Sequence, residues 1–273
     1  MPNKRTAFFV SDRTGITAEM LGHSLLAQFP GLQFDMVTLP FVDTVDKALA
    51  AREKIRQAER QGPRPLIFSS LADPEIRAIV AACNALTLDV FEAFSAMLEV
   101  ELETEASHAA GRFRGTDDEA VFKQRMDAIN FTMAHDDGAS TRDFQHADII
   151  LVGVSRTGKT PTCLYLALQY GIRAANYPLT TEDFDEPQLP AALRPYRAKL
   201  YGLTTGPERL HQIRQARKPD SNYASLRACQ YEIRQAEALF RAHTIPFLDS
   251  TDQSIEEIAS AILHEAKLER RLR

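Results

Sequence analysis

The stretch LVGVSRTGKT, residues 151–160, carries the residue types that bind phosphate. Gly153, Gly158, Lys159 and Thr160 satisfy the spacing G-x-x-x-x-G-K-S/T of a phosphate-binding loop. The glycines let the backbone curl so that successive N–H groups point at phosphate oxygens, and the helix that follows adds the positive end of its dipole. In such a loop the lysine reaches the outer phosphates and the hydroxyl of Thr160 holds Mg²⁺.

The alternative to a phosphate-binding loop is a chance match to this pattern. The context argues against chance, because the most apolar segment of the chain, HADIILVGV, runs directly into the loop and a helical pattern, KTPTCLYLALQYG, leaves it. Pro161 is neutral in the first turn of that helix, where a backbone N–H has no partner within the helix. We assign the nucleotide site to the whole loop: Gly153, Val154, Ser155, Arg156, Thr157, Gly158, Lys159 and Thr160.

Two carboxylates stand just upstream of the loop strand, in the sequence HDDG. Asp136 or Asp137 is a candidate general base for a hydroxyl proton or a candidate Mg²⁺ ligand. Of the two we favour Asp137, because the adjacent Gly138 lets the chain leave the helix and turn a carboxylate toward the loop. The alternative, which sequence alone favours, is a solvated helix end. In that case the next candidates are Asp148 and Asp249, each on or beside a predicted strand.

A second turn of similar composition, SDRTG at residues 11–15, follows the first predicted strand. Thr14 and Gly15 suit another anion-binding turn. A plain strand-to-helix turn capped by Ser11 or Asp12 explains the same residues equally well.

Other polar residues carry weaker signals. Arg194, Arg197 and Arg209 are candidate phosphate clamps, although solvated arginines are the plainer interpretation. The seven histidines show no ligand spacing, so we expect no zinc-type site.

The elements that must position the loop alternate between strand and helix patterns, which predicts parallel sheets covered on both faces. We predict an α/β fold in which an N-terminal Rossmann-like unit precedes a P-loop kinase-like domain. The expected division is an N-terminal α/β domain over residues 1–104, a connector and helix over 105–144, and a nucleotide-binding domain over 145–273. No internal repeat is evident in the sequence.

Composition limits the class of protein. The chain has 273 residues, of which 44% are hydrophobic and 25% charged, as in an ordinary globular protein. Residues 1–144 carry 15 Lys and Arg against 22 Asp and Glu, a balance of −7, and residues 145–273 carry 17 against 15, a balance of +2. Neither half is basic enough to indicate a nucleic-acid partner. No segment is apolar enough for a membrane span, and three scattered cysteines indicate reduced thiols, so we expect a cytoplasmic protein.

Several longer motifs together resemble the phosphoenolpyruvate synthase regulatory proteins, a family related to the pyruvate, phosphate dikinase regulatory proteins. The resemblance spans residues 6–263 and rests on FFVSDRTGITAE, HDDG, GVSRTGKTPTCLYLA, YGLTTGPERLHQIR and SIEEIA. The match at the loop is far more restrictive than the generic pattern, because Ser155, Arg156, Thr157 and Pro161 also agree.

The resemblance implies a bifunctional enzyme. Such proteins use ADP to phosphorylate a threonine beside a phosphohistidine on the target enzyme, which inactivates the target. They also remove that phosphate with inorganic phosphate as acceptor, forming pyrophosphate. On this chain, residues 153–160 would be the ADP site, Lys159, Asp137 and Asp136 the catalytic candidates, and Thr160 the Mg²⁺ ligand. The implied partner is phosphoenolpyruvate synthase, and we expect the chain to form a homo-oligomer, a dimer.

Three alternatives stay open at this point. The same chemistry could act on pyruvate, phosphate dikinase, although the wording of the motifs favours the synthase. A small-molecule P-loop kinase would explain the C-terminal half, with PERLHQIRQAR as a lid helix, but not the N-terminal half, for which we expect a role in target docking. A nucleotide sensor without catalysis would need no carboxylate near the loop. A distance above about 12 Å between Lys159 and the aspartates would favour the sensor.

Overall fold

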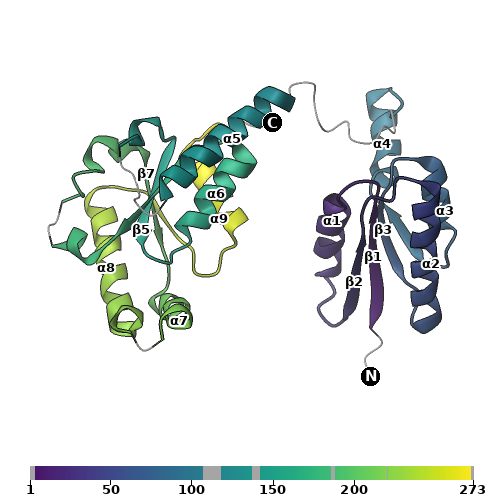
Figure 1. The fold of residues 1–273 in the computed structure, drawn as a ribbon, viewed down its shortest axis with the longest axis horizontal. Helices are drawn as coiled ribbons and strands as arrows, with labels where there is room; N and C mark the ends of the chain where they lie inside the picture. The colour runs from purple at the N-terminus through teal and green to yellow at the C-terminus, as the bar shows by residue number, and fades with distance from the viewer. Residues whose placement is uncertain (1–3, 107–117, 137–141, 186–187, 220, 272–273) are drawn as a thin grey trace. The chain divides into compact units, whose positions relative to one another are not determined.

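The structure is a computed structural model that describes residues 4–106, 118–136, 142–185, 188–219 and 221–271. The chain divides into two compact units, Met1–Gly115 and Thr116–Arg273. Each unit contains its own four-stranded parallel sheet with helices on both faces (Figure 1). The predicted α/β fold with two units is therefore confirmed.

The first unit has the strand order β2-β1-β3-β4, with all neighbours parallel. Alternate residues of the central strand face opposite layers, as the period of two in a strand requires. Phe8 and Val10 join the core beneath α2 and α3, whereas Ala7 and Phe9 pack with α1. The elements of this unit are β1 (Arg5–Ser11), α1 (Ile16–Leu26), β2 (Phe34–Leu39), α2 (Val45–Gln61), β3 (Leu66–Ser70), α3 (Pro74–Ala81), β4 (Leu86–Asp89) and α4 (Glu92–Leu102).

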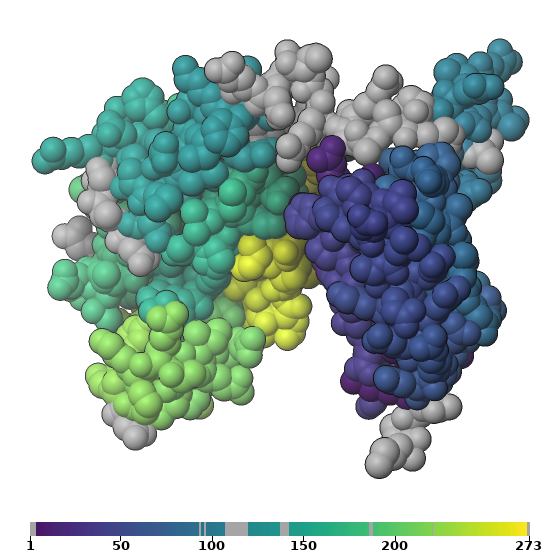
Figure 2. Space-filling model, turned by 45° about the vertical axis from the view of Figure 1, so that its right-hand side comes forward, coloured from purple at the N-terminus to yellow at the C-terminus, as the bar shows by residue number. Residues whose placement is uncertain are grey.

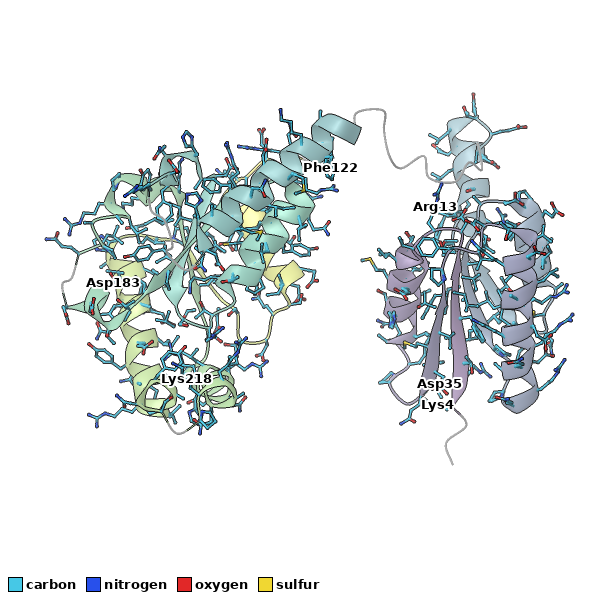
Figure 3. The ribbon with its side chains drawn as sticks, in the orientation of Figure 1. Lys4, Arg13, Asp35, Phe122, Asp183 and Lys218 are labelled. Atoms are coloured by element: carbon cyan, nitrogen blue, oxygen red, sulfur yellow. The ribbon has the colours of Figure 1, made fainter. Side chains whose placement is uncertain are left out.

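Parallel strands send every loop that follows a strand to one edge of the sheet. Figure 3 shows this polarity in the first unit, where Arg13 lies beyond the carboxyl end of β1 while the ion pair of Lys4 with Asp35 lies at the opposite edge. A ligand site formed by the SDRTG turn would therefore lie at the carboxyl edge, as is usual for α/β sheets.

The second unit has the strand order β6-β5-β7-β8, again with all neighbours parallel. Ile150, Val152 and Val154 of the central strand pack toward α8, while Ile149 and Leu151 pack toward α6 and α9. Figure 2 shows α8 in light green and α9 in yellow at the surface of this unit. Its strands are β5 (Ile149–Val154), β6 (Ala174–Leu179), β7 (Leu200–Thr204) and β8 (Phe247–Asp249).

Helix α5 (Asp118–Ala134) belongs to the second unit, where it packs on α6 and β6. The segment expected as a connector, 105–144, is thus shared between the two units. The remaining helices of the second unit are α6 (Lys159–Tyr170), α7 (Pro207–Arg217), α8 (Leu226–Ala242), α9 (Ile255–Glu265) and the 3₁₀ turns η2 (Phe144–His146), η3 (Thr181–Phe184), η4 (Arg194–Lys199) and η5 (Asn222–Ala224).

The two units share one order of strands in their sheets. Both place the first strand between the second and the third. In both, the first strand is followed by a Ser-Arg-Thr-Gly turn, with one inserted residue in the first unit, and the glycine that begins the helix has a left-handed conformation: φ is 85° at Gly15 and 87° at Gly158. The similarity in sequence is limited to this turn, so the absence of an internal repeat stays a prediction. Ile16 stands where the second unit has Lys159.

Candidate phosphate-binding site

The loop begins where β5 approaches β7 most closely. A Cβ atom on Gly153 would lie 2.2 Å from the carbonyl oxygen of Leu203, so only glycine fits between the two strands. At the other end, Gly158 adopts a φ of 87° and caps α6 without a side-chain hydrogen bond to the first turn. The helix therefore begins with backbone N–H groups that no side chain of the cap satisfies, which is the environment that an anion occupies.

The loop lysine is buried against the loop itself. Lys159 is 4% exposed, and its Nζ donates a hydrogen bond to the carbonyl oxygen of Val154 at 2.8 Å. The hydroxyl of Thr157 donates to the same oxygen at 3.1 Å. The lysine charge is thus held over the inside of the loop, where a phosphate group would meet it.

Three segments that are distant in sequence meet at Thr160. Its hydroxyl donates to Oδ1 of Asp136 at 2.8 Å. The side-chain amide of Asn176, on β6, donates to the same carboxylate oxygen at 2.7 Å and to the Thr160 oxygen at 3.0 Å. Asn176 is 1% exposed, so this triangle is fixed in the interior beside the loop.

The triangle fits a magnesium ion by the chemistry of its donors. Mg²⁺ prefers hard oxygen ligands, and the hydroxyl of Thr160 and the carboxylate of Asp136 provide two of them side by side. Because consecutive Cα atoms are about 3.8 Å apart, the Asp136 carboxylate lies within about 9 Å of the Lys159 Cα atom. This distance is below the limit of about 12 Å above which a pure nucleotide sensor would be favoured.

The preferred aspartate, Asp137, lies outside the described residues, as does Gly138. Of the two reserve candidates, Asp148 precedes β5 and thus lies at the edge opposite the loop, where it accepts a hydrogen bond from the Arg173 backbone and pairs with Arg271. Asp249 ends β8 at the correct edge, but its carboxylate accepts hydrogen bonds from the backbone and side chain of Thr251. Asp148 is therefore excluded as a general base for this loop.

The candidate arginines divide between the two edges. Arg194 and Arg197 lie in η4, before β7, and so stand at the edge opposite the loop, where each donates to a backbone carbonyl. The structure excludes both arginines as phosphate clamps, because the length of a strand separates them from the edge of the sheet where the loop lies. Arg209 lies in the first turn of α7, at the carboxyl edge, and is exposed.

In the first unit, the side chains of Ser11 and Asp12 in the SDRTG turn accept hydrogen bonds from outside the first turn of α1. Ser11 accepts a hydrogen bond from the Arg13 backbone at 3.1 Å, and Asp12 accepts one from the Ala72 backbone at 3.4 Å. Neither caps α1, which begins at Gly15 without a side-chain cap. The expected capping by Ser11 or Asp12 is therefore wrong, whereas a plain strand-to-helix turn stays open. The turn shares a left-handed glycine with the loop of the second unit but lacks its lysine and its left-handed arginine.

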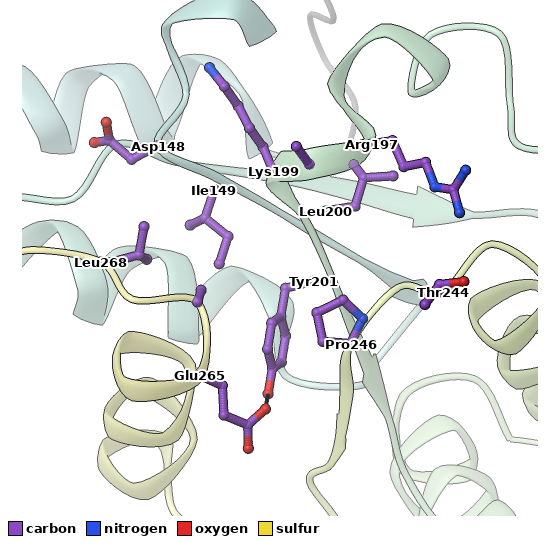
Figure 4. Close-up of a pocket in the computed structure, with 12 residues that line it drawn as sticks. Asp148, Ile149, Arg197, Lys199, Leu200, Tyr201, Thr244, Pro246, Glu265 and Leu268 are labelled. Carbon is purple, nitrogen blue, oxygen red and sulfur yellow. Dashed lines mark hydrogen bonds between the residues drawn. The ribbon is translucent and has the colours of Figure 1, made fainter.

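A separate pocket of about 570 Å³ opens at the opposite edge of the second sheet (Figure 4). It is lined by Ile149 and Leu200, the first residues of β5 and β7, and by Tyr201 and Glu265. The Tyr201 hydroxyl donates a hydrogen bond to Glu265 at 2.5 Å. Burial and this hydrogen bond raise the pKa of Tyr201. Because the pocket lies at the amino ends of the strands, it is not part of the loop site.

Two residues of the loop's surroundings were missed from the sequence: Asn176 and Arg214. A polar side chain inside the strand pattern RAANYPL was the available signal for Asn176. Arg214 is fully buried against the loop, and nothing in its helical sequence distinguishes it from the solvated arginines nearby.

Among the residues that the structure describes, no helix combines the length and apolarity needed to cross a membrane. Within the same residues, no group of three or more His, Cys, Asp or Glu side chains could hold a metal ion. A metal at the loop would therefore need the Thr160 hydroxyl and the nucleotide phosphates as further ligands.

The chain matches the protein family described as Kinase/pyrophosphorylase over residues 7–263. A protein of Laribacter hongkongensis (strain HLHK9) is 55% identical over 273 residues, which cover 99% of this chain and 100% of that protein. A protein of Alkalilimnicola ehrlichii is 53% identical over 98% of both chains, and one of Stutzerimonas stutzeri (strain A1501) is 52% identical over 99% of this chain and 100% of its own. All three are named "Putative phosphoenolpyruvate synthase regulatory protein".

Proposed function

Since this chain belongs to the kinase/pyrophosphorylase family, which confirms the resemblance drawn from its motifs, we propose that it is a bifunctional regulator of phosphoenolpyruvate synthase. In one direction it transfers the β-phosphoryl group of ADP to the hydroxyl of a target threonine and releases AMP, which inactivates the target. In the other direction inorganic phosphate attacks the phosphothreonine, the threonine hydroxyl is regenerated and pyrophosphate leaves, which restores the target.

The observation that carries the proposal is the buried Lys159 at the start of α6, beside a carboxylate that contacts the loop. Phosphoryl transfer requires positioning of the reactants and neutralisation of charge on the transferred group. Lys159 and the amino end of α6 supply positive charge in both directions. One loop can therefore serve ADP in phosphorylation and inorganic phosphate in the reverse reaction.

The residues that would hold Mg²⁺ are Thr160 and Asp136. When bound, the ion would neutralise charge on the phosphates of the substrate. Asn176 holds both oxygens in place through its two hydrogen bonds.

The candidates for the general base are the two aspartates of the HDDG motif. Oδ1 of Asp136 already accepts hydrogen bonds from Thr160 and Asn176, and this carboxylate is the one proposed to hold Mg²⁺. We therefore assign the proton of the incoming threonine to Asp137. In the reverse reaction the same carboxylate would return that proton to the threonine oxygen.

The experiment uses ADP labelled on its β-phosphate, incubated separately with purified phosphoenolpyruvate synthase and with pyruvate, phosphate dikinase. We expect label in a threonine of the synthase and, after addition of unlabelled inorganic phosphate, labelled pyrophosphate. The matched control is Lys159→Ala, which should lower both rates by about 10²–10³, the usual effect of losing one preorganised electrostatic contact.

Each other outcome has a defined meaning. Label in the dikinase alone would transfer the proposal to that target. Label in neither protein, or equal rates for a folded Lys159→Ala variant, would refute the proposed function. Consumption of ADP without a protein acceptor would instead support the small-molecule kinase.

A further inference from the structure

A buried arginine touches the loop from outside. Arg214, on α7, is fully buried, and its guanidinium forms two hydrogen bonds with Glu232 of α8, from Nη1 at 3.1 Å and from Nη2 at 2.6 Å. Burial alone would lower the pKa of Arg214, but the hydrogen bond and the charge of Glu232 outweigh burial and raise it. Nη2 also donates to the carbonyl oxygen of Ser155, inside the loop, at 3.2 Å.

Tyr223 completes this cluster. Its ring lies 4.0 Å beneath the Arg214 guanidinium, whose Nη1 donates to the Tyr223 carbonyl at 3.1 Å. The Tyr223 hydroxyl donates to the hydroxyl oxygen of Ser155 at 3.0 Å. Ser155 is therefore held at both its carbonyl and its side chain by one cluster of Arg214, Tyr223 and Glu232.

Holding the Ser155 carbonyl determines where the next N–H points. In a trans peptide the C=O and the following N–H point in opposite directions, so the Arg156 N–H is directed away from α7. Arg156 itself has a φ of 78°, in the left-handed region that is unfavourable for a non-glycine residue, so its surroundings must impose this conformation. A similar hydrogen bond, from the Ser250 hydroxyl to the Thr157 carbonyl at 3.1 Å, holds the peptide that carries the Gly158 N–H.

We propose that Arg214 is a positioning residue for the nucleotide, which with Tyr223 and Glu232 fixes the Ser155–Arg156 peptide so that its N–H is presented to phosphate. This inference rests on the proposed function, because it takes residues 153–160 as the phosphate-binding loop. Glu232 balances the charge of Arg214, so Arg214 acts on the loop through the fixed, forked arrangement of its N–H donors. This effect on the loop should be the same whether ADP or inorganic phosphate binds. Lysine lacks the fork and cannot replace it.

The test separates positioning from stability. Replacing a buried ion pair by apolar residues of similar volume is often neutral for stability, so the double variant Arg214→Met/Glu232→Leu should keep its thermal midpoint. Tyr223→Phe removes only the hydroxyl that contacts Ser155. The control is Arg241→Met on α8, which breaks an ion pair with Glu237 at a side chain that is 63% exposed.

Thermal unfolding and calorimetric titration with ADP, and separately with inorganic phosphate, give the readouts. We expect the double variant and Arg214→Lys to bind both ligands about 10- to 100-fold more weakly, the range for hydrogen bonds to a charged group, and Tyr223→Phe about 2- to 10-fold more weakly. Arg241→Met should bind as the parent does.

A folded double variant with parental affinity for both ligands would overturn the proposal while leaving the loop assignment intact. If the double variant does not fold, Tyr223→Phe decides, and parental affinity in that variant overturns the proposal. A parent protein that binds neither ADP nor inorganic phosphate would refute the proposed function itself, and the inference with it.

Discussion

The substitution Gly153→Ala tests the contact on which the loop depends. The new Cβ would lie 2.2 Å from the Leu203 carbonyl oxygen, whereas van der Waals contact begins near 3.5 Å. Strands β5 and β7 would have to separate by about 1 Å from a normal spacing of about 4.8 Å. Nearby ladder hydrogen bonds of about 2.9 Å would then exceed their normal length.

The cost can be worked out from these displacements. Overpacking costs about 1–3 kcal/mol, and each weakened ladder hydrogen bond adds about 0.5–1.5 kcal/mol. A total of about 2–4 kcal/mol lowers the midpoint of thermal unfolding by about 4–16 °C in a domain of about 150–250 residues. Since the displacement occurs at the first residue of the loop, ADP affinity should fall as well.

Differential scanning calorimetry and titration with ADP measure both effects, and two other glycines provide controls. Gly158→Ala meets no atom within 4 Å but has a φ of 87°, so it should cost only the conformational strain of about 1–2 kcal/mol. Gly31→Ala, in the first unit, meets nothing and has no left-handed φ, so it should not destabilise the protein. A Gly153→Ala variant with parental midpoint and ADP affinity, or one less affected than Gly158→Ala, would refute the steric argument.

Two further predictions concern the carboxylates and the thiols. Asp136→Asn should raise the Mg²⁺ concentration needed for half-maximal activity, whereas Asp137→Asn should lower turnover by about 10²–10⁴ with ADP affinity nearly unchanged; parental behaviour of both variants would show that HDDG is only a helix end. Burial raises the pKa of all three thiols, but Cys163 and Cys229 are fully buried and Cys83 only half-buried, so at pH 8 a thiol reagent should label the native protein at Cys83 alone and all three cysteines only after denaturation. Rapid labelling of Cys163 in the native state would contradict its burial beneath the loop helix.

The elements of the loop could be predicted because their signals are local. An apolar strand, a glycine spacing and a helical period are each encoded within a few residues, and they led to the correct end of β5 and the correct start of α6, whereas β5 begins three residues later than the pattern HADIILVGV. The alternation of such elements predicted two parallel sheets for the same reason. Capping is harder to predict at the level of single residues: Thr44 caps α2, while the neighbouring Asp43 pairs with Lys47.

The partners of the loop were decided by tertiary structure alone. Asp136 meets Thr160 and Asn176 only because α5 packs on α6 and β6, a contact between segments 24 and 40 residues apart that no local pattern records. The direction of the strands places Arg194 and Arg197 at the edge of the sheet opposite the loop. The packing of α7 places the buried Arg214 against Ser155 of the loop. The sequence by itself therefore determined which segment forms the loop, whereas the packing of helices on the sheet determined which side chains surround that loop, because packing depends on contacts between distant residues.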